Sequence, residues 1–199
     1  MDTVTKPIVS LYTESTPNPL TMKFVINRML LQGLSVDYVD AEAAKDSPLS
    51  QALLGFDFVN GVFIKNNFVS ITKTEEAVWE EIIPEVREFL RGYLTEDKAI
   101  FTDEGLTNLQ TQVQEETKDK SDIEKQIMEL INQYVQPAVE MDGGSIVFKN
   151  YDEGVVTLGM EGACSGCPSS TITLKNGIQG LLQRMMPEGL VTEVIAEDM

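Results

Sequence analysis

A polar segment at residues 96–120 constrains the fold most, because it divides the sequence into two stretches that each hold enough apolar residues for a core. The segment is rich in Thr, Gln and acidic residues and poor in bulky apolar ones. It has too little to bury to offset the entropy lost on ordering it. The sequence therefore predicts an α+β protein with two small α/β-sandwich domains, residues 1–95 and 121–199, joined by a flexible acidic linker over residues 96–120.

The first stretch combines alternating apolar residues with clear turn and helix signals. Its expected strands are residues 8–12, 22–26, 36–39, 62–65 and 68–71. Asn66-Asn67 is expected to form a hairpin turn, because Asn tolerates positive φ. One helix should begin at Ser47-Pro48 and stop at Gly55. A second helix, capped by Thr74, should be kinked or restarted by Pro84. Nothing in this stretch indicates catalysis, so we interpret it as an adaptor domain.

The second stretch opens on a strong helix start signal. Ser121 and Glu124 form the sequence pattern of a capping box, and apolar residues follow at helical spacing. Asp142-Gly143-Gly144 predicts a tight turn with positive φ. The remaining elements are expected at residues 146–151, 155–160 and 190–195 as strands, and at residues 171–185 as a helix with Ile172, Ile178, Leu181, Leu182 and Met185 facing inward. The pattern predicts a three-stranded sheet backed by two helices.

The chain contains no histidine and carries 32 acidic against 15 basic residues, a formal net charge of −17. Without His it has no Ser–His–Asp or Cys–His nucleophile and no HExxH zinc site. The acidic balance argues against nucleic acid and against anionic membrane surfaces as partners. The first residues lack a signal-peptide or transit pattern, so we expect a cytoplasmic protein whose cysteines stay reduced.

Cys164 and Cys167 form a C-x-x-C pair between a predicted strand and a predicted helix. Two intervening residues let both thiolates point at one centre, and a helix N-terminus favours the thiolate form. Iron–sulfur clusters are held by four thiolates, and a structural zinc ion is coordinated by four ligands. A site on this chain must therefore be completed by a second chain, an external thiol or a target protein.

The residues alone leave three rival interpretations of the cysteine pair open: a thiol–disulfide oxidoreductase, an inter-chain zinc-binding interaction module, or two incidental cysteines. A thioredoxin-type redox pair also lies between a strand and a helix, although here Ala163 precedes the first Cys and the expected element order is not βαβ. Spacing cannot separate zinc from iron.

At these residues the chain resembles the Nfu family, the stand-alone relatives of the C-terminal part of NifU. The resemblance covers about residues 8–95 and 121–197. Its motifs are Thr16-Pro17-Asn18-Pro19, Ser47-Pro48-Leu49, Ile71-Thr72-Lys73, Asp142-Gly143-Gly144, Gly162-Ala163-Cys164-Ser165-Gly166-Cys167-Pro168-Ser169-Ser170 and Thr173-Leu174-Lys175-Asn176-Gly177-Ile178.

The resemblance implies an iron–sulfur cluster scaffold or carrier and not an enzyme. Two copies of the second domain would each donate Cys164 and Cys167 to hold one [4Fe-4S] cluster in a homodimer, with [2Fe-2S] as a second form. The first domain would recognise targets, and the partners would be upstream cluster assembly proteins and apo iron–sulfur client proteins. Because such a site is anionic, the ten acidic residues within 126–199 are expected to face away from the cysteine pair.

Overall fold

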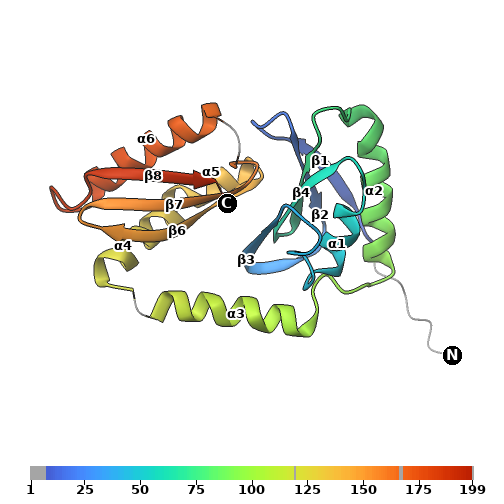
Figure 1. Ribbon diagram of the computed structural model, residues 1–199, viewed down its shortest axis with the longest axis horizontal. Coiled ribbons are helices and arrows are strands. Elements are labelled where there is room, and N and C mark those ends of the chain that lie inside the picture. The colour runs from blue at the N-terminus through green and yellow to red at the C-terminus, as the bar shows by residue number, and fades with distance from the viewer. Residues whose placement is uncertain (1–7, 119, 166–167, 199) are drawn as a thin grey trace.

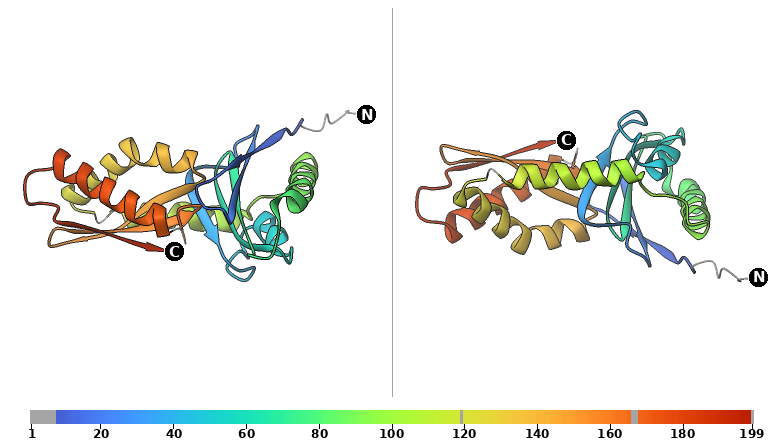
Figure 2. Two further views of the ribbon diagram at one scale, coloured as in Figure 1. Left: turned by 90° about the horizontal axis from the view of Figure 1, so that it is seen from above. Right: turned by 90° about the horizontal axis from the view of Figure 1, so that it is seen from below.

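The computed structural model describes residues 8–118, 120–165 and 168–198, which form two α/β domains, each built on its own sheet (Figure 1). The first sheet is antiparallel with strand order β1-β2-β5-β4-β3. Its strands are β1 (Leu11–Ser15), β2 (Thr21–Ile26), β3 (Leu31–Tyr38), β4 (Val59–Asn66) and β5 (Phe68–Lys73). Helices α1 (Pro48–Leu54) and α2 (Trp79–Thr95) lie on the side of this sheet away from the second domain (Figure 2).

The alternation of side chains along these strands gives the first sheet two buried faces. One face packs on α1 and α2 and contains Phe24, Val62 and Ile64 among its fully buried residues. The opposite face carries a separate small cluster of Val25, Phe63 and Phe68. We call this second face the docking face; its members are Lys23, Val25, Ser35, Asp37, Phe63, Lys65, Phe68 and Ser70.

The second domain is a three-stranded sheet of order β6-β7-β8 with its helices on one side (Figure 2). β6 and β7 are antiparallel, whereas β8 runs parallel to β7 and is reached through a helix. The elements are α4 (Asp122–Tyr134), α5 (Gln136–Met141), β6 (Gly144–Asp152), β7 (Val155–Gly162), α6 (Pro168–Met185) and β8 (Glu193–Asp198). Its core joins Ile127 and Ile131 of α4, Leu158 of β7 and Leu182 of α6.

Most local predictions are confirmed. The Ser121–Glu124 capping box has both reciprocal bonds, and Ser47 caps α1, which ends before Gly55. Asn66 in the β4–β5 hairpin has φ 48°, and Gly143 has φ 83°. The expected three-stranded sheet is present in the second domain with the two expected helices, α4 and α6, and a short further helix, α5, also contributes to the core.

Other local predictions are wrong. Thr74 does not cap α2, whose N-cap is Val78 without a side-chain cap bond. Pro84 does not restart the helix, which continues through it with Pro84 on an exposed side, so a kink is the part of that expectation that stays a prediction. Ile172 and Met185 of α6 are exposed rather than inward. β1 and β8 each lie three residues further along the chain than predicted.

Residues 103–118 form helix α3 (Asp103–Lys118) within the segment expected to be a flexible linker. The start of α3 is held by the first domain. The Thr102 N–H donates to the Asp46 carbonyl at 2.9 Å, Phe101 is buried in the first core, and Leu106 packs against that core. The few apolar residues of the segment are therefore gathered at one end, where an existing core covers them. Sequence composition averaged over the segment hides this clustering.

None of the helices in the described part of the chain is long and apolar enough to cross a membrane.

Candidate functional site

Cys164 lies in the loop that joins the end of β7 to α6, as the sequence predicts. We call residues 163–167 the cysteine loop, of which 163–165 are described. The loop is a tight turn in which the Cys164 N–H donates to the Glu161 carbonyl at 3.3 Å and the Ser165 N–H to the Gly162 carbonyl at 3.1 Å. Cys164 is buried, at 5% exposure, and packs with the second core. Cys167 lies outside the described residues.

The turn at Gly143-Gly144, which follows α5, packs directly against the cysteine loop. The Gly143 carbonyl accepts a hydrogen bond from the Ala163 N–H at 3.3 Å. A Cβ at Gly144 would lie 2.6 Å from the Cys164 Sγ and 2.6 Å from the Glu161 carbonyl oxygen. A side chain at position 144 would therefore require the thiol or the Glu161 carbonyl to shift.

A cavity of about 380 Å³ opens between α5 and α6, with Cys164 in its lining. Leu174 and Val139 contribute apolar side chains, and Pro17 of the first domain closes one side. Asp142 also lines the cavity. The expectation that the acidic residues of the second domain face away from the cysteine pair stays a prediction.

The docking face of the first domain contacts the end of the second domain that carries the cysteine loop. Asp37 Oδ2 accepts a 2.6 Å hydrogen bond from the Gly162 N–H, and Ser70 Oγ donates at 2.6 Å to the Gly143 carbonyl. Lys23 Nζ donates to the Met141 carbonyl at 3.2 Å. From the β1–β2 turn, Asn18 Nδ2 donates to the Ser165 carbonyl at 3.2 Å. The first domain therefore binds main-chain groups on both sides of Cys164.

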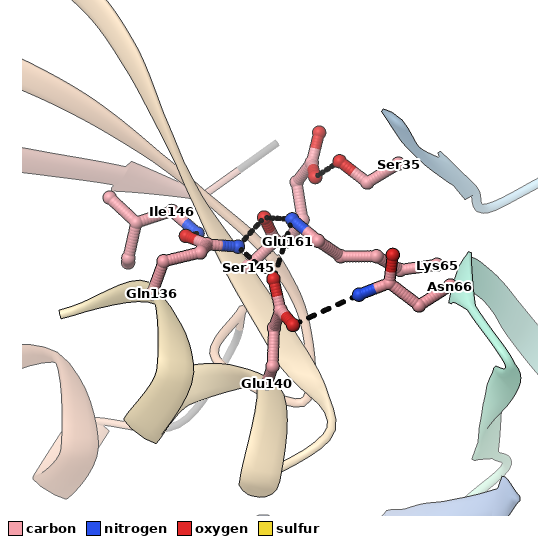
Figure 3. Close-up of polar contacts among 8 residues, drawn as sticks. All are labelled: Ser35, Lys65, Asn66, Gln136, Glu140, Ser145, Ile146 and Glu161. Carbon is pink, nitrogen blue, oxygen red and sulfur yellow. Dashed lines mark hydrogen bonds and ion pairs between the residues drawn. The ribbon is translucent and has the colours of Figure 1, made fainter. Parts of the chain in front are cut away.

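Figure 3 shows a polar network that joins the two domains beside these bonds. Lys65 Nζ reaches Glu140 Oε1 at 3.2 Å and Ser145 Oγ at 3.0 Å. Glu140 also accepts from Asn66 Nδ2 at 3.0 Å and from Gln136 Nε2 at 3.1 Å (Figure 3). The side chain of Lys65 is 12% exposed and that of Glu140 25%, so the ion pair is shielded from solvent. Removing one partner of such a pair leaves the other charge uncompensated.

Two carboxyl groups lie buried where the domains meet. Burial raises the pKa of Asp37 to about 6, against the opposing effect of the Gly162 hydrogen bond, and the nearby Glu161 raises it further. Burial also raises the pKa of Glu161, while the Ser35 hydroxyl, 2.6 Å from its Oε2, and the charges of Lys65 and Lys149 oppose the rise. Closing the domains together therefore favours the protonated form of both acids.

The sequence interpretation missed the docking face entirely. Its signal is present in the strands: Phe63 and Phe68 alternate with the core residues Val62, Ile64 and Val69. Strands that are apolar at consecutive positions are buried on both faces.

No group of three or more His, Cys, Asp or Glu residues that could hold a metal ion occurs within residues 8–118, 120–165 and 168–198.

Comparisons with known proteins match both halves of the chain to Nfu and NifU family models. Residues 11–97 match the family model described as "Scaffold protein Nfu/NifU N terminal", and residues 127–195 match "NifU-like domain". Two proteins named "NFU1 iron-sulfur cluster scaffold homolog, mitochondrial" align along most of the sequence. That of Drosophila willistoni is 39% identical over 92% of this chain, and that of Drosophila persimilis is 36% identical over 100%.

The chain spans 62% of the length of the Drosophila willistoni protein and 69% of that of Drosophila persimilis. Both relatives are named as mitochondrial, so their names do not support the cytoplasmic location expected for this chain. A solution structure of a NifU-like protein from Saccharomyces cerevisiae covers 48% of this chain and 87% of its own, with 23% identity and a TM-score of 0.43. That likeness is too weak to add to the assignment.

The identity, the coverage and the two family models agree with the motifs around Cys164 and in the first domain. The chain therefore belongs to the Nfu family of iron–sulfur cluster scaffold proteins, a non-catalytic family.

Proposed function

We propose that two copies of this chain hold one [4Fe-4S] cluster through Cys164 and Cys167 of each and pass it to apo client proteins. The observation that carries the proposal is the position of Cys164. It lies in a tight turn just before α6 and is one of the residues that line the cavity between α5 and α6. Cys167 follows three positions later in the sequence, with two residues between the cysteines, and this spacing suits a second thiolate on the same metal centre.

The surroundings of Cys164 suit a site that releases its cargo. The positive end of the α6 dipole favours an anionic thiolate–cluster complex. Because each chain supplies two thiolates, the cluster is shared between chains and stays exposed at its edge. A client thiolate then binds an exposed iron, one cysteine of the scaffold leaves that iron, and repetition of the exchange moves the cluster. No electron is transferred in these steps.

The first domain supplies the recognition of clients in this proposal. Within the described residues it has no metal-binding group and presents a docking face that binds protein main chain through Lys23, Ser70 and Asp37. Such a surface suits contact with other proteins rather than chemistry. Upstream assembly proteins that load the cluster are the further partners.

Anaerobic reconstitution with ferrous iron and sulfide tests the cluster proposal. We expect about two irons and two sulfides per chain, in a particle with the mass of a dimer, because one [4Fe-4S] cluster is shared by two chains. Cys164→Ser and Cys167→Ser should each abolish stable loading. Ser165→Ala, in the same loop, is the matched control and should load as the wild type does.

The two alternatives give different results in the same measurements. A zinc module would form a dimer with zinc and take up no sulfide. A thiol–disulfide oxidoreductase would show a reduction potential and catalyse disulfide exchange without iron. A Cys164→Ser or Cys167→Ser chain that kept its full cluster content would contradict the proposed ligands.

A further inference from the structure

The docked arrangement of the two domains places the first domain directly on the backbone around Cys164. Gly162, two residues before the cysteine, donates to Asp37, and Ser165, immediately after it, accepts from Asn18. The Gly143 carbonyl, which accepts from Ala163 within the second domain, accepts from Ser70 across the interface as well. Hydrogen bonds to the first domain therefore hold the turn at both of its described ends, Gly162 and Ser165.

The docking face and the cysteine-loop end of the second domain are also closely packed against each other. A Cβ placed on Gly162 would lie 2.8 Å from the Phe63 ring, and one on Gly143 would lie 2.9 Å from Ser70 Oγ. Ser70 is 1% exposed, and Lys23 and Glu161 are 8% and 6% exposed. Polar groups this well buried and paired are characteristic of a formed interface.

We infer that the docking face is the binding surface for the cysteine-loop end of its own chain, and that this docking competes with the pairing of two chains around a cluster. The inference rests on the proposed function, because it concerns how a cluster-bridged dimer forms. The partner of the surface is the end of the second domain formed by residues 140–145 and 161–165, recognised by its main-chain groups and by the carboxylates of Glu140 and Glu161.

The competition follows from what each arrangement needs. In a bridged dimer, the cysteine loops of two chains converge on one cluster. In the docked chain, the backbone on both sides of Cys164 is fixed to the β1–β2 turn and to β3 of the first domain. A second loop approaching the same thiols meets the first domain beside them. Opening the docked arrangement frees the cysteine loop and exposes the docking face at the same time, so loading and client recognition become available together.

Lys65→Glu tests the inference without altering the second domain. It places a carboxylate against Glu140 and near Glu161, where the wild type has an ion pair and a bond to Ser145. Like charges brought together at an interface oppose association. We expect the ratio of docked to open chains to fall by about a hundredfold. In small-angle X-ray scattering of the full-length apo chain, the radius of gyration should rise.

The same proteins are then loaded anaerobically with ferrous iron and sulfide, and the rate of dimer formation is followed. Lys65→Glu should form the loaded dimer faster than the wild type. Lys98→Glu is the matched control, because it makes the same charge change just after α2, at an exposed lysine whose contacts with Glu96 and the Tyr93 ring are local. It should change neither scattering nor loading. The double variant K65E/E140K restores opposite charges and should return both readouts towards the wild type, which separates undocking from misfolding.

A Lys65→Glu chain that scatters like the wild type would overturn the docking. A chain that opens but loads at the wild-type rate would overturn the competition. If the wild type and every variant take up neither iron nor sulfide, the proposed function fails and the competition fails with it, while scattering still reports the docking separately.

Discussion

The main-chain N–H of Gly162 donates a 2.6 Å hydrogen bond to Asp37 Oδ2 across the two domains. This bond ties the sheet of the first domain to the residue two positions before Cys164. The carboxyl that accepts it is held in an environment that raises its pKa to about 6. The state of the cysteine loop is therefore coupled to the protonation of a side chain in the other domain.

The first prediction is that docking weakens as the pH rises from 5 to 7.5. In the separated domains Asp37 returns to its ordinary pKa of 3.8, so the docked state binds the proton more tightly. The stabilisation is complete below pH 3.8 and is lost as the pH rises through 6. Between pH 5 and 7.5 the docked-to-open ratio should fall by about tenfold, or about 1.4 kcal/mol. Glu161, whose pKa is also raised, acts in the same direction.

Hydrogen exchange at the Gly162 amide measures this opening, once corrected for the intrinsic dependence of exchange on pH. In Asp37→Asn the side-chain oxygen still accepts the bond, but no proton binds, so the dependence should shrink to the part due to Glu161. The Val194 amide, bonded to Gln179 within the second domain, is the internal control. Equal pH dependence in the wild type and in Asp37→Asn would contradict the prediction.

The second prediction concerns the glycine beneath the thiol. Gly144→Ala should displace the cysteine loop, because the new Cβ would lie 2.6 Å from both the Cys164 Sγ and the Glu161 carbonyl oxygen. We expect a loss of about 1–3 kcal/mol in the free energy of unfolding, as for overpacked cores. Cluster loading should drop although both cysteines remain.

Gly180→Ala in α6 is the matched control, since nothing lies within 4 Å of its Cβ. Alanine there should stabilise the helix by up to about 1 kcal/mol and leave loading unchanged. Iron and sulfide content after reconstitution measures the loading of each variant, and chemical denaturation measures its free energy of unfolding. Normal loading in Gly144→Ala would show that the position of the Cys164 thiol is not set by this contact.

The two domains and the cysteine pair can be predicted from sequence because their signals are local. The capping box at Ser121 and the hairpin at Asn66 each depend on neighbouring residues, and the structure has both. The docking face depends on which segments meet in space. Asp37 and Gly162 are 125 residues apart, and nothing in either local pattern identifies the other. Long-range polar contacts of this kind are set by the relative placement of whole domains.

Two further features depend on contacts between segments that local sequence patterns do not show. Composition predicts a linker at residues 96–120 and does not show that Phe101 and Leu106 pack on a core built by other segments. Thr74 fits a capping position, yet α2 starts at Trp79, where the indole N–H donates to the Pro19 carbonyl at 2.9 Å. In both cases tertiary contacts override the local preference.

The third prediction is that the segment between the domains is anchored by Phe101. The ring is 5% exposed in the first core, so Phe101→Ala should lower the free energy of unfolding by about 3 kcal/mol. Asn108→Ala, at an exposed position of α3, should change it by less than about 0.5 kcal/mol. Urea denaturation of the full chain gives both values. Comparable effects of the two substitutions would mean that α3 is not held by the first core.

The fourth prediction separates backbone strain from contact between domains. Gly162 and Gly189 both have positive φ, at 62° and 83°, but only Gly162 has neighbours where a Cβ would be added. Alanine at either position should cost about 1–2 kcal/mol through its conformation. Gly162→Ala should cost more and should also raise the radius of gyration, because its Cβ would lie 2.8 Å from the Phe63 ring and 2.8 Å from the Gly143 carbonyl oxygen.

A double-mutant cycle with Phe63→Ala isolates the part of that cost that crosses the interface. Removing the ring makes room for the new methyl group on one of its two crowded sides, so Gly162→Ala should be less harmful in the Phe63→Ala background. Residues in direct contact show coupling of about 0.5–3 kcal/mol in such cycles. Gly189→Ala, combined with Phe63→Ala, should be additive. Additivity for Gly162 as well would place the two domains apart in solution, because a docked chain cannot accommodate both the methyl group and the ring.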